Sequence, residues 1–427
     1  MIRVKKNHLK LSKKEFQFLK YLCHNSKNLY NSGLYAARQH FFNCGKFLDY
    51  VQTYKHLKDS DVYKSLPSDP AQQTLKVVER SFRSFFGLLQ KKKKGNYNRP
   101  VKIPGYLDKQ GFFPLFFPVR PGCMKDGFAI RVPKHLQDKF GFKMFRVTKP
   151  DYIKGKKIKE VRIIPRQKGG YYEIEWVYEE VETKTQFRQD RIVSIDIGVS
   201  NFATLVDSKS GRSIILDGRE LKSYNRFCNK KSSRKQAGSK SKLKLWSKRT
   251  RKLNDAMNQY VNFVLQYCLH NEVYKVVVGE GYLAQEGSNL GPTNNQNFVQ
   301  LPFGKFCQKL EGKLQAYGIV FETIPEPYTS KCDHFAGEAM CHHEKYLGKR
   351  VKRGLFKSSA GILLNADVNG AVGILLKSSG KSISDVDLGQ LACRGCLTQP
   401  RRVRLSSIRS SSSIRLVKVL TNQATGL

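Results

Sequence analysis

The sequence has 427 residues, more than one compact hydrophobic core accommodates and enough for two or three domains. Lysine and arginine together number 77 against 34 aspartates and glutamates, so the formal net charge is +43. An ordinary soluble enzyme does not need such an excess, whereas a protein with a polyanionic partner does. The composition therefore predicts a nucleic-acid partner.

The sequence has no feature of a membrane or secreted protein. It contains no run of 18 or more apolar residues, and its start, Met1 to Lys14, is basic without the apolar core of a signal peptide. The ten cysteines lack the dense spacing of a small secreted scaffold, so reduced thiols are expected. These features predict a soluble, cytoplasmic protein with no membrane partner, associated with the nucleoid when it binds DNA.

The first hundred residues are predicted to be mainly helical. Ser12 and Glu15 have the spacing of a capping box, and apolar residues at helical intervals follow as far as about Phe42. A second helix follows Pro70 and ends where four lysines precede Gly95, because cations favour the negative end of a helix and glycine stops it.

The chain then changes to short runs of aromatic and β-branched residues, broken by proline and glycine, which predict a β-rich module between Phe112 and Tyr178. Its clearest strand, from Tyr171 to Tyr178, alternates between two faces. From Arg191 onward, predicted strands and helices alternate, which is typical of an α/β domain. The strands are 192–198, 201–206, 213–216, 273–278 and 319–324, and the helices are 239–270, 303–317 and one that begins near Asp367.

Two basic segments are candidates for contact with nucleic acid. The predicted helix 239–270 buries an apolar stripe, so its cations stay exposed, either for solvation alone or to face phosphates. The end of the chain, from about Lys377, is rich in serine and arginine, and we expect it to be flexible until RNA or DNA covers it. The nucleic-acid-binding candidates on the helix are Lys242, Lys248, Arg249 and Arg251.

Three carboxylates stand out in a chain where acids are scarce. Asp196 lies inside an apolar strand, where a charge is costly unless a cation or a hydrogen-bond donor compensates it. Glu280 ends another apolar strand, and Asp367 opens the last helix. Each also has a structural interpretation: Asp367 as a helix N-cap, Glu280 as the anchor of the next loop, and Asp196 as an acceptor for neighbouring backbone.

Taken together, the three acids fit the hydrolysis of a phosphodiester. Two magnesium ions bridged by carboxylates can activate a water and stabilise the leaving oxygen, and carboxylate oxygens suit this hard cation. The acids lie far apart in the sequence, so only the fold can bring them together. The sequence predicts a catalytic metal site of Asp196, Glu280 and Asp367 that holds two Mg²⁺, with Mn²⁺ as a substitute.

The order of these acids resembles the RuvC-like nuclease core of TnpB proteins and of their relatives, the type V CRISPR effectors. The pattern is an Asp followed by Ile197 and Gly198 on a first strand, a Glu after a later strand, and Asp-x-Asn at the last helix. Residues 326–331 and 353–357 are similar to the segments that lead into and out of the family's zinc-ribbon insertion. The specific resemblance covers about Arg191 to Leu376.

The resemblance implies an α/β chain, α+β overall, with an RNase H-like RuvC nuclease domain and an amino-terminal β-barrel wedge that carries an inserted helical recognition lobe. By resemblance, the amino-terminal half grips a guide RNA and reads a short DNA motif beside the target. The implied domains are a wedge of residues 1–10 and 111–190, a recognition lobe of 11–110, a RuvC-like domain of 191–328 and 361–376, an insertion of 329–360 and a tail of 377–427.

The insertion departs from the family pattern. Commoner members carry two Cys-x-x-Cys knuckles that hold a structural zinc, whereas here residues 332–335 read CDHF and residues 357–360 read KSSA. Structural Zn²⁺ is therefore doubtful, and packing or hydrogen bonding is expected to replace it. Alternative ligands are Cys341, His342, His343 and the pair Cys393 and Cys396. Arg353 would bind the scissile phosphate, or else is one more surface cation.

Three functions remain open. The first is a transposon-encoded, RNA-guided, magnesium-dependent DNA endonuclease whose partners are guide RNA and target double-stranded DNA. The second is a catalytically silent RNA-guided DNA-binding regulator or accessory transposition protein. The third is a transposase that joins DNA strands, which the sequence disfavours because it has no convincing tyrosine nucleophile with a paired-histidine metal motif. The intact acids favour the first; the sequence does not indicate the oligomeric state.

Overall fold

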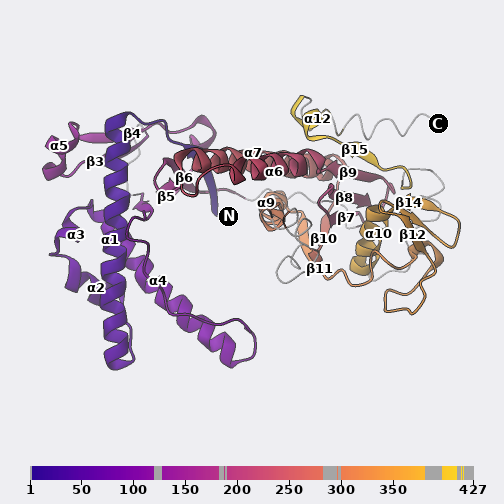
Figure 1. The fold of residues 1–427 in the computed structure, drawn as a ribbon, viewed down its shortest axis with the longest axis horizontal. Helices are drawn as coiled ribbons and strands as arrows, with labels where there is room; N and C mark the ends of the chain where they lie inside the picture. The colour runs from indigo at the N-terminus through magenta and orange to yellow at the C-terminus, as the bar shows by residue number, and fades with distance from the viewer. Residues whose placement is uncertain are drawn as a thin grey trace. The chain divides into compact units, whose positions relative to one another are not determined.

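The computed structural model describes residues 2–119, 127–181, 187, 190–281, 296, 300–379, 397–410, 415 and 417. The chain divides into two compact units, Met1–Val181 and Glu182–Leu427, and each contains an extensive hydrophobic core (Figure 1). The mixed α/β character predicted from the sequence is confirmed. No helix in the described part of the chain is long and apolar enough to cross a membrane.

The first unit contains the two long helices that the sequence predicts. Its helices are α1 (Lys13–Cys44), α2 (Tyr50–Leu57), α3 (Asp61–Lys64) and α4 (Ser68–Lys93). The capping box before α1 is confirmed, because the Ser12 hydroxyl accepts from the Glu15 backbone N–H and the Glu15 carboxylate accepts from that of Ser12. The long helices α1 and α4 pack together through an apolar cluster that includes Leu34 and Phe82.

The strands of the first unit form two antiparallel sheets. The elements are β1 (Ile2–His8), β2 (Leu115–Pro118), β3 (Phe128–Arg131), α5 (Lys134–Phe140), β4 (Met144–Val147), the 3-10 helix η1 (Asp151–Ile153), β5 (Ile158–Arg166) and β6 (Tyr171–Glu179). The larger sheet has the order β1-β6-β5-β2, and β3 pairs with β4. Within the described strands neither sheet closes on itself, so the β-barrel that the resemblance implies is not confirmed.

The second unit is built on a six-stranded sheet. Its strands are β7 (Ile192–Ile197), β8 (Asn201–Asp207), β9 (Ser213–Asp217), β10 (Lys275–Gly279), β11 (Val320–Ile324) and β15 (Arg401–Val403). The order is β11-β10-β7-β8-β9-β15. Strands β7, β8 and β9 form an antiparallel meander, in which β8 pairs with β7 and with β9. On the other side of β7, β10 is parallel to β7 and β11 is parallel to β10. The sequence predicted all of these strands except β15.

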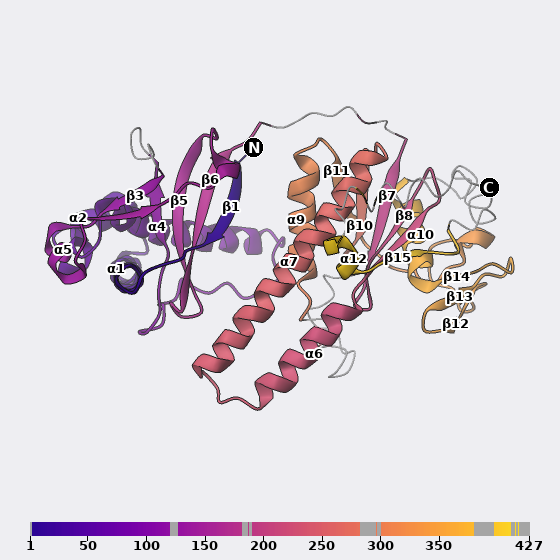
Figure 2. The same ribbon diagram turned by 90° about the horizontal axis from the view of Figure 1, so that it is seen from above.

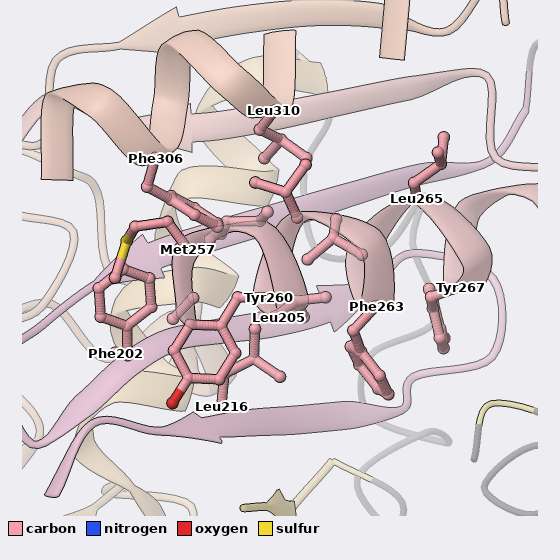
Figure 3. Packing of buried hydrophobic residues seen from close by; sticks show 14 of the residues in the cluster. Phe202, Leu205, Leu216, Met257, Tyr260, Phe263, Leu265, Tyr267, Phe306 and Leu310 are labelled. Carbon is pink, nitrogen blue, oxygen red and sulfur yellow. The ribbon is translucent and has the colours of Figure 1, made fainter. Parts of the chain in front are cut away.

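Helices of the second unit cover both faces of this sheet. They are α6 (Arg219–Ser233), α7 (Lys240–His270), α9 (Phe303–Gln315), α10 (Ala366–Ser379) and α12 (Leu405–Ser410). Val193 and Ile195 of β7 belong to the core that α7 and α9 cover, where Tyr260 and Phe306 pack together with the sheet (Figure 3). The alternate residue Ser194 faces α10, because its hydroxyl donates to the Ala371 carbonyl at 2.7 Å. Asp196 therefore also belongs to the α10 face.

The insertion between β11 and α10 has a small sheet of its own, separate from the six-stranded sheet. It contains the 3-10 helix η3 (His334–Ala336) and a three-stranded antiparallel sheet of β12 (Lys349–Lys352), β13 (Leu355–Lys357) and β14 (Leu363–Asn365). Phe356 and Leu364 join the cluster that packs on α10. The insertion is thus anchored to the helix that carries Asp367.

Part of the segment predicted to be a flexible tail, residues 397–410, lies within the described part of the chain. Residues 397–410 contribute β15, which pairs in parallel with β9, and α12, which contacts α7. Leu397, Val403 and Leu405 are buried in the second unit. These apolar residues anchor residues 397–410 at the sheet edge, and the flexibility of the tail stays a prediction.

Candidate functional site

The register of the parallel strands brings the predicted acids to one edge of the sheet. Ile195 pairs with Val278, and Gly279 pairs with Ile324, so Asp196 lies level with Gly279 in the next strand. Glu280 is the first residue beyond β10. The carboxyl ends of parallel strands meet at the same edge, so both acids reach it.

Asp367 joins this edge because α10 packs across β7. It is the second residue of the helix, and its carboxylate accepts a hydrogen bond of 2.6 Å from the side-chain amide of Asn201 on β8. Its backbone N–H donates to the Asn365 side chain at 2.9 Å, so Asn365 caps this end of the helix. The side chain of Asp367 is thereby free of the N-cap role that the sequence left open.

Charges of the same sign meet around Asp196. Burial raises the pKa of Asp196 well above the usual carboxyl range, and the charges of Glu326 and Asp367 raise it further, whereas Arg350 opposes the rise. A guanidinium nitrogen of Arg350 lies 4.0 Å from a carboxylate oxygen of Asp367. The site is therefore an anionic cluster that one arginine partly compensates.

Glu280 is held at the sheet edge by its neighbour on β11. The Thr323 hydroxyl donates to the Glu280 carboxylate at 2.9 Å. Thr323 pairs with Val278 in the parallel ladder, one residue before the glycine that precedes Glu280. The position of this acid is thus fixed by the backbone pairing of two strands and by a side-chain hydrogen bond between them.

Glu326 is a fourth acid of the site, and the sequence analysis did not single it out. Its carboxylate lies against Gly279 and Gly281, at positions that a Cβ on either glycine would occupy. One carboxylate oxygen is buried and has no hydrogen-bond partner in the described part of the chain. Burial raises the pKa of Glu326, the charge of Glu280 adds to this, and a backbone hydrogen bond from Gly281 opposes it.

Glu326 therefore interacts electrostatically with both Asp196 and Glu280. The signal in the sequence was available: Glu326 follows the apolar strand β11, which lies beside β10, as Glu280 follows β10. Arg350 had no comparable signal, because the hairpin of β12 and β13 decides which basic residue of the insertion approaches Asp367.

The donors of this cluster are all carboxylates, and they fit a hard divalent cation such as Mg²⁺. Their arrangement is less compact than a closed metal site. Among the residues that the structure describes, no three His, Cys, Asp or Glu side chains are grouped closely enough to hold a metal ion. Their negative charges nevertheless act on one another. The charge of Glu280 acts on Glu326, and the charges of Glu326 and Asp367 act on Asp196.

The predicted nucleic-acid-binding cations differ in their surroundings. Lys248 and Arg251 on α7 and Arg353 in the insertion are exposed. Arg249 is held inside the unit, because its guanidinium donates to the Asn225 side chain at 2.8 Å and to the Gln300 carbonyl at 2.9 Å. Lys242 is partly covered and donates to the Lys235 carbonyl. Arg249 thus joins α6 to α7, and the binding role of all five residues stays a prediction.

In the insertion, hydrogen bonds to Asp333 join residues 332–335 to residues 357–360, the two segments in which the expected Cys-x-x-Cys pairs are missing. The Ser358 hydroxyl donates to both carboxylate oxygens, at 2.7 and 2.9 Å, and Ser359 donates through its backbone N–H and its hydroxyl. Asp333 is fully buried. Cys341 and His343 contact each other at 3.4 Å, and the pair at 393 and 396 lies outside the described residues.

Two family models match the segments that contain the acids of this site. The family model described as "Probable transposase" matches residues 175–284, which include Asp196 and Glu280. The model described as "Cas12f1-like, TNB domain" matches residues 303–374, which include Glu326 and Asp367. TnpB-like protein ORF457 of Acidianus two-tailed virus is 24% identical over 411 residues, which cover 86% of this chain and 85% of that protein.

The fold also has a counterpart among solved structures. Cas12f1, solved in a complex with sgRNA and target DNA, superposes with a TM-score of 0.54 and 15% identity over 85% of this chain and 83% of that one. The chain thus shares its fold with Cas12f1, and parts of it match models of transposase and Cas12f1-like families. Over most of its length it is similar to a TnpB-like protein.

Proposed function

We propose that this protein is a transposon-encoded, RNA-guided DNA endonuclease that hydrolyses phosphodiester bonds of target DNA at a RuvC-like site. The convergence of Asp196, Glu280 and Asp367 at one edge of the sheet carries the proposal. The meander of three strands followed by two parallel strands, in the order β9-β8-β7-β10-β11, supports an RNase H-like domain.

The partners are a guide RNA and target double-stranded DNA. Two observations support them: the formal net charge of +43 and the fold shared with Cas12f1, whose solved complex contains sgRNA and target DNA. We assign the grip on RNA and the reading of an adjacent DNA motif to the first unit, and we propose that its helices α1 to α4 form the recognition lobe and its four-stranded sheet part of the wedge. The second unit would contain the nuclease domain and the insertion.

Asp196, Glu280 and Asp367 would hold two Mg²⁺, or Mn²⁺ in their place. Bound there, the ions would acidify the attacking water and stabilise the leaving oxygen. The protein's own contribution is positional: Asn201 orients Asp367, and Thr323 orients Glu280. Arg350 is the cation that we expect to meet the scissile phosphate, because it lies beside Asp367.

Cleavage of a matched plasmid tests the proposal. The protein, purified with the RNA that accompanies it, should cut DNA that matches this RNA in magnesium, and Asp196→Ala should abolish cutting while guided binding remains. Asp151→Ala, an exposed acid of the first unit, is the control and should cut normally. Equal cutting by Asp196→Ala and the parent would reject the site.

A silent RNA-guided DNA-binding protein is the second candidate. It is favoured by the loose grouping of the acids, since within the described residues no three of them are placed to hold a metal ion. Tight guided binding without cleavage, in both magnesium and manganese, would select this alternative.

A further inference from the structure

The hairpin of α6 and α7 has the most one-sided charge of the second unit. Between residues 221 and 254 the sequence contains 13 lysines and arginines and no aspartate or glutamate. Figure 2 shows the two helices side by side, with their connecting turn directed away from the sheet. A protein surface that needs only solvation usually mixes both signs, whereas a surface with a large excess of cations attracts a polyanion. Glu220 and Asp255 lie just outside this segment, and Glu220 pairs with Lys252 at 3.6 Å.

Aromatic rings are interleaved with these cations. Lys252 of α7 lies over the Tyr224 ring at 4.2 Å, Tyr224 stacks with Phe227 at 6.3 Å, and Lys231 lies over the Phe227 ring at 5.5 Å. Phe227 is 55% exposed, although a phenylalanine in a helix usually packs inward.

The core-facing side of α6 does not need Phe227. Leu221, Asn225 and Cys228 are buried at helical spacing, and Arg249 joins Asn225 to the rest of the unit. Phe227 lies off this buried stripe. Tyr224 and Phe227 are three residues apart, so both project from the same side of the helix. The Phe227 ring therefore lies on the surface of the hairpin, where it contacts Tyr224 and Lys231 but is not part of the core.

We propose that the α6–α7 hairpin binds an unpaired segment of RNA, with a base stacked on Phe227 and phosphates on the surrounding cations. A single-stranded nucleic acid offers both features, since every base has a ring face and stacking on aromatic side chains tolerates any sequence. Double-stranded DNA keeps its bases stacked inside, whereas folded RNA presents loops and ends whose bases are accessible. The inference rests on the RNA partner of the proposed function but not on cleavage.

Photocrosslinking of RNA that carries 5-iodouridine tests this contact on the full-length protein. Crosslinked peptides should map to residues 221–254. Phe227→Ala and Phe227→Leu should lower the crosslink yield there and weaken binding of unpaired RNA roughly 10- to 100-fold at a salt concentration that screens phosphate contacts. Phe227→Tyr, which keeps a ring, should retain both. Thermal unfolding of each variant shows whether the hairpin is still folded.

Three outcomes would overturn the inference. They are an unchanged crosslink in Phe227→Leu, equal crosslinking of duplex RNA, and preferential crosslinking of single-stranded DNA of the same sequence. Asp196→Ala should crosslink like the parent protein, so a failure of the nuclease proposal would leave this result untouched.

Discussion

The carboxylate of Glu326 occupies the space beside Gly279 that any larger residue there would need. Gly279 lies level with Asp196 in the adjacent strand, so the missing side chain opens a place next to the predicted catalytic acid, and Glu326 fills it. The same carboxylate lies against Gly281, on the other side of Glu280. Two glycines around Glu280 thus allow a fourth acid to enter the site.

We expect Glu326→Gln to raise the magnesium concentration for half-maximal cleavage, on the order of 10- to 100-fold, because the substitution removes a negative charge that interacts with Asp196 and Glu280. Guided DNA binding should not change. The control is Glu322→Gln, which changes an acid of β11, the strand that Glu326 follows; Glu322 pairs with Lys275. An unaltered magnesium dependence in Glu326→Gln would assign Glu326 a purely structural role.

Arg350 and Arg353 provide a matched pair of arginines within one hairpin. Both are exposed, but Arg350 lies 4.0 Å from Asp367, whereas Arg353 lies at the turn between β12 and β13. Arg350→Ala should slow cleavage on the order of 100-fold, as the loss of a preorganised cation at a developing charge does. Arg353→Ala should have a small effect. Single-turnover cleavage at saturating magnesium measures both, and the opposite ranking would restore the sequence-based choice of Arg353.

The sequence predicted the elements that have strong periodicity. The long helix was expected at 239–270 and is observed at Lys240–His270, with Ser239 as its N-cap. The apolar strands β7 to β11 were found for the same reason. Helix α6 was missed because its buried positions include Asn225 and Ser232 as well as Leu221 and Cys228, so no apolar stripe marks it. Polar residues become core residues there only because α7 covers them.

The sequence could name the acids of the candidate site, but it could not predict how they are arranged in space. Asp196, Glu280 and Asp367 end or begin elements, which a linear reading detects. The role of Glu326 depends on two glycines in another strand, and that of Arg350 on the register of β12 with β13. Such relationships arise from strand pairing across distant segments. A local pattern could mark Glu326 as an acid that follows a strand, but it could not place Glu326 against Gly279 or Arg350 beside Asp367.

Asp333 is expected to hold the insertion together without zinc. Asp333→Asn replaces one of two acceptor oxygens that receive bonds from Ser358 and Ser359, and should cost about 1.5–3 kcal/mol of local stability. Limited proteolysis of the insertion should become faster, whereas Glu344→Gln, an exposed acid of the same segment, should not change it. Elemental analysis of the purified protein should find no stoichiometric zinc, and a chelator should leave the proteolysis rate unchanged. Bound zinc that protects the segment would contradict this assignment.

Asp207 is expected to make the second unit sensitive to acid. Its side chain is 1% exposed and receives hydrogen bonds from Arg191 at 2.7 Å and from the Tyr267 hydroxyl at 2.6 Å. Burial alone would raise the pKa of Asp207, but the hydrogen bond and charge of Arg191, together with Tyr267, outweigh it and hold that pKa below the usual value. The ionised form is therefore the one that stabilises the fold.

A carboxyl group whose pKa is lower in the folded state than in the unfolded state stabilises the fold when it is ionised. This stabilisation is complete above the unfolded-state pKa of about 3.9, and it is lost as the pH falls through the folded-state pKa. Asp207→Asn should lower the free energy of unfolding by about 3–5 kcal/mol at neutral pH, because Arg191 loses the charge that compensates it in a buried position. Urea unfolding at pH 7 and at pH 3 should show a smaller difference between variant and parent in acid. A difference independent of pH would mean that packing, rather than the ion pair, explains the loss.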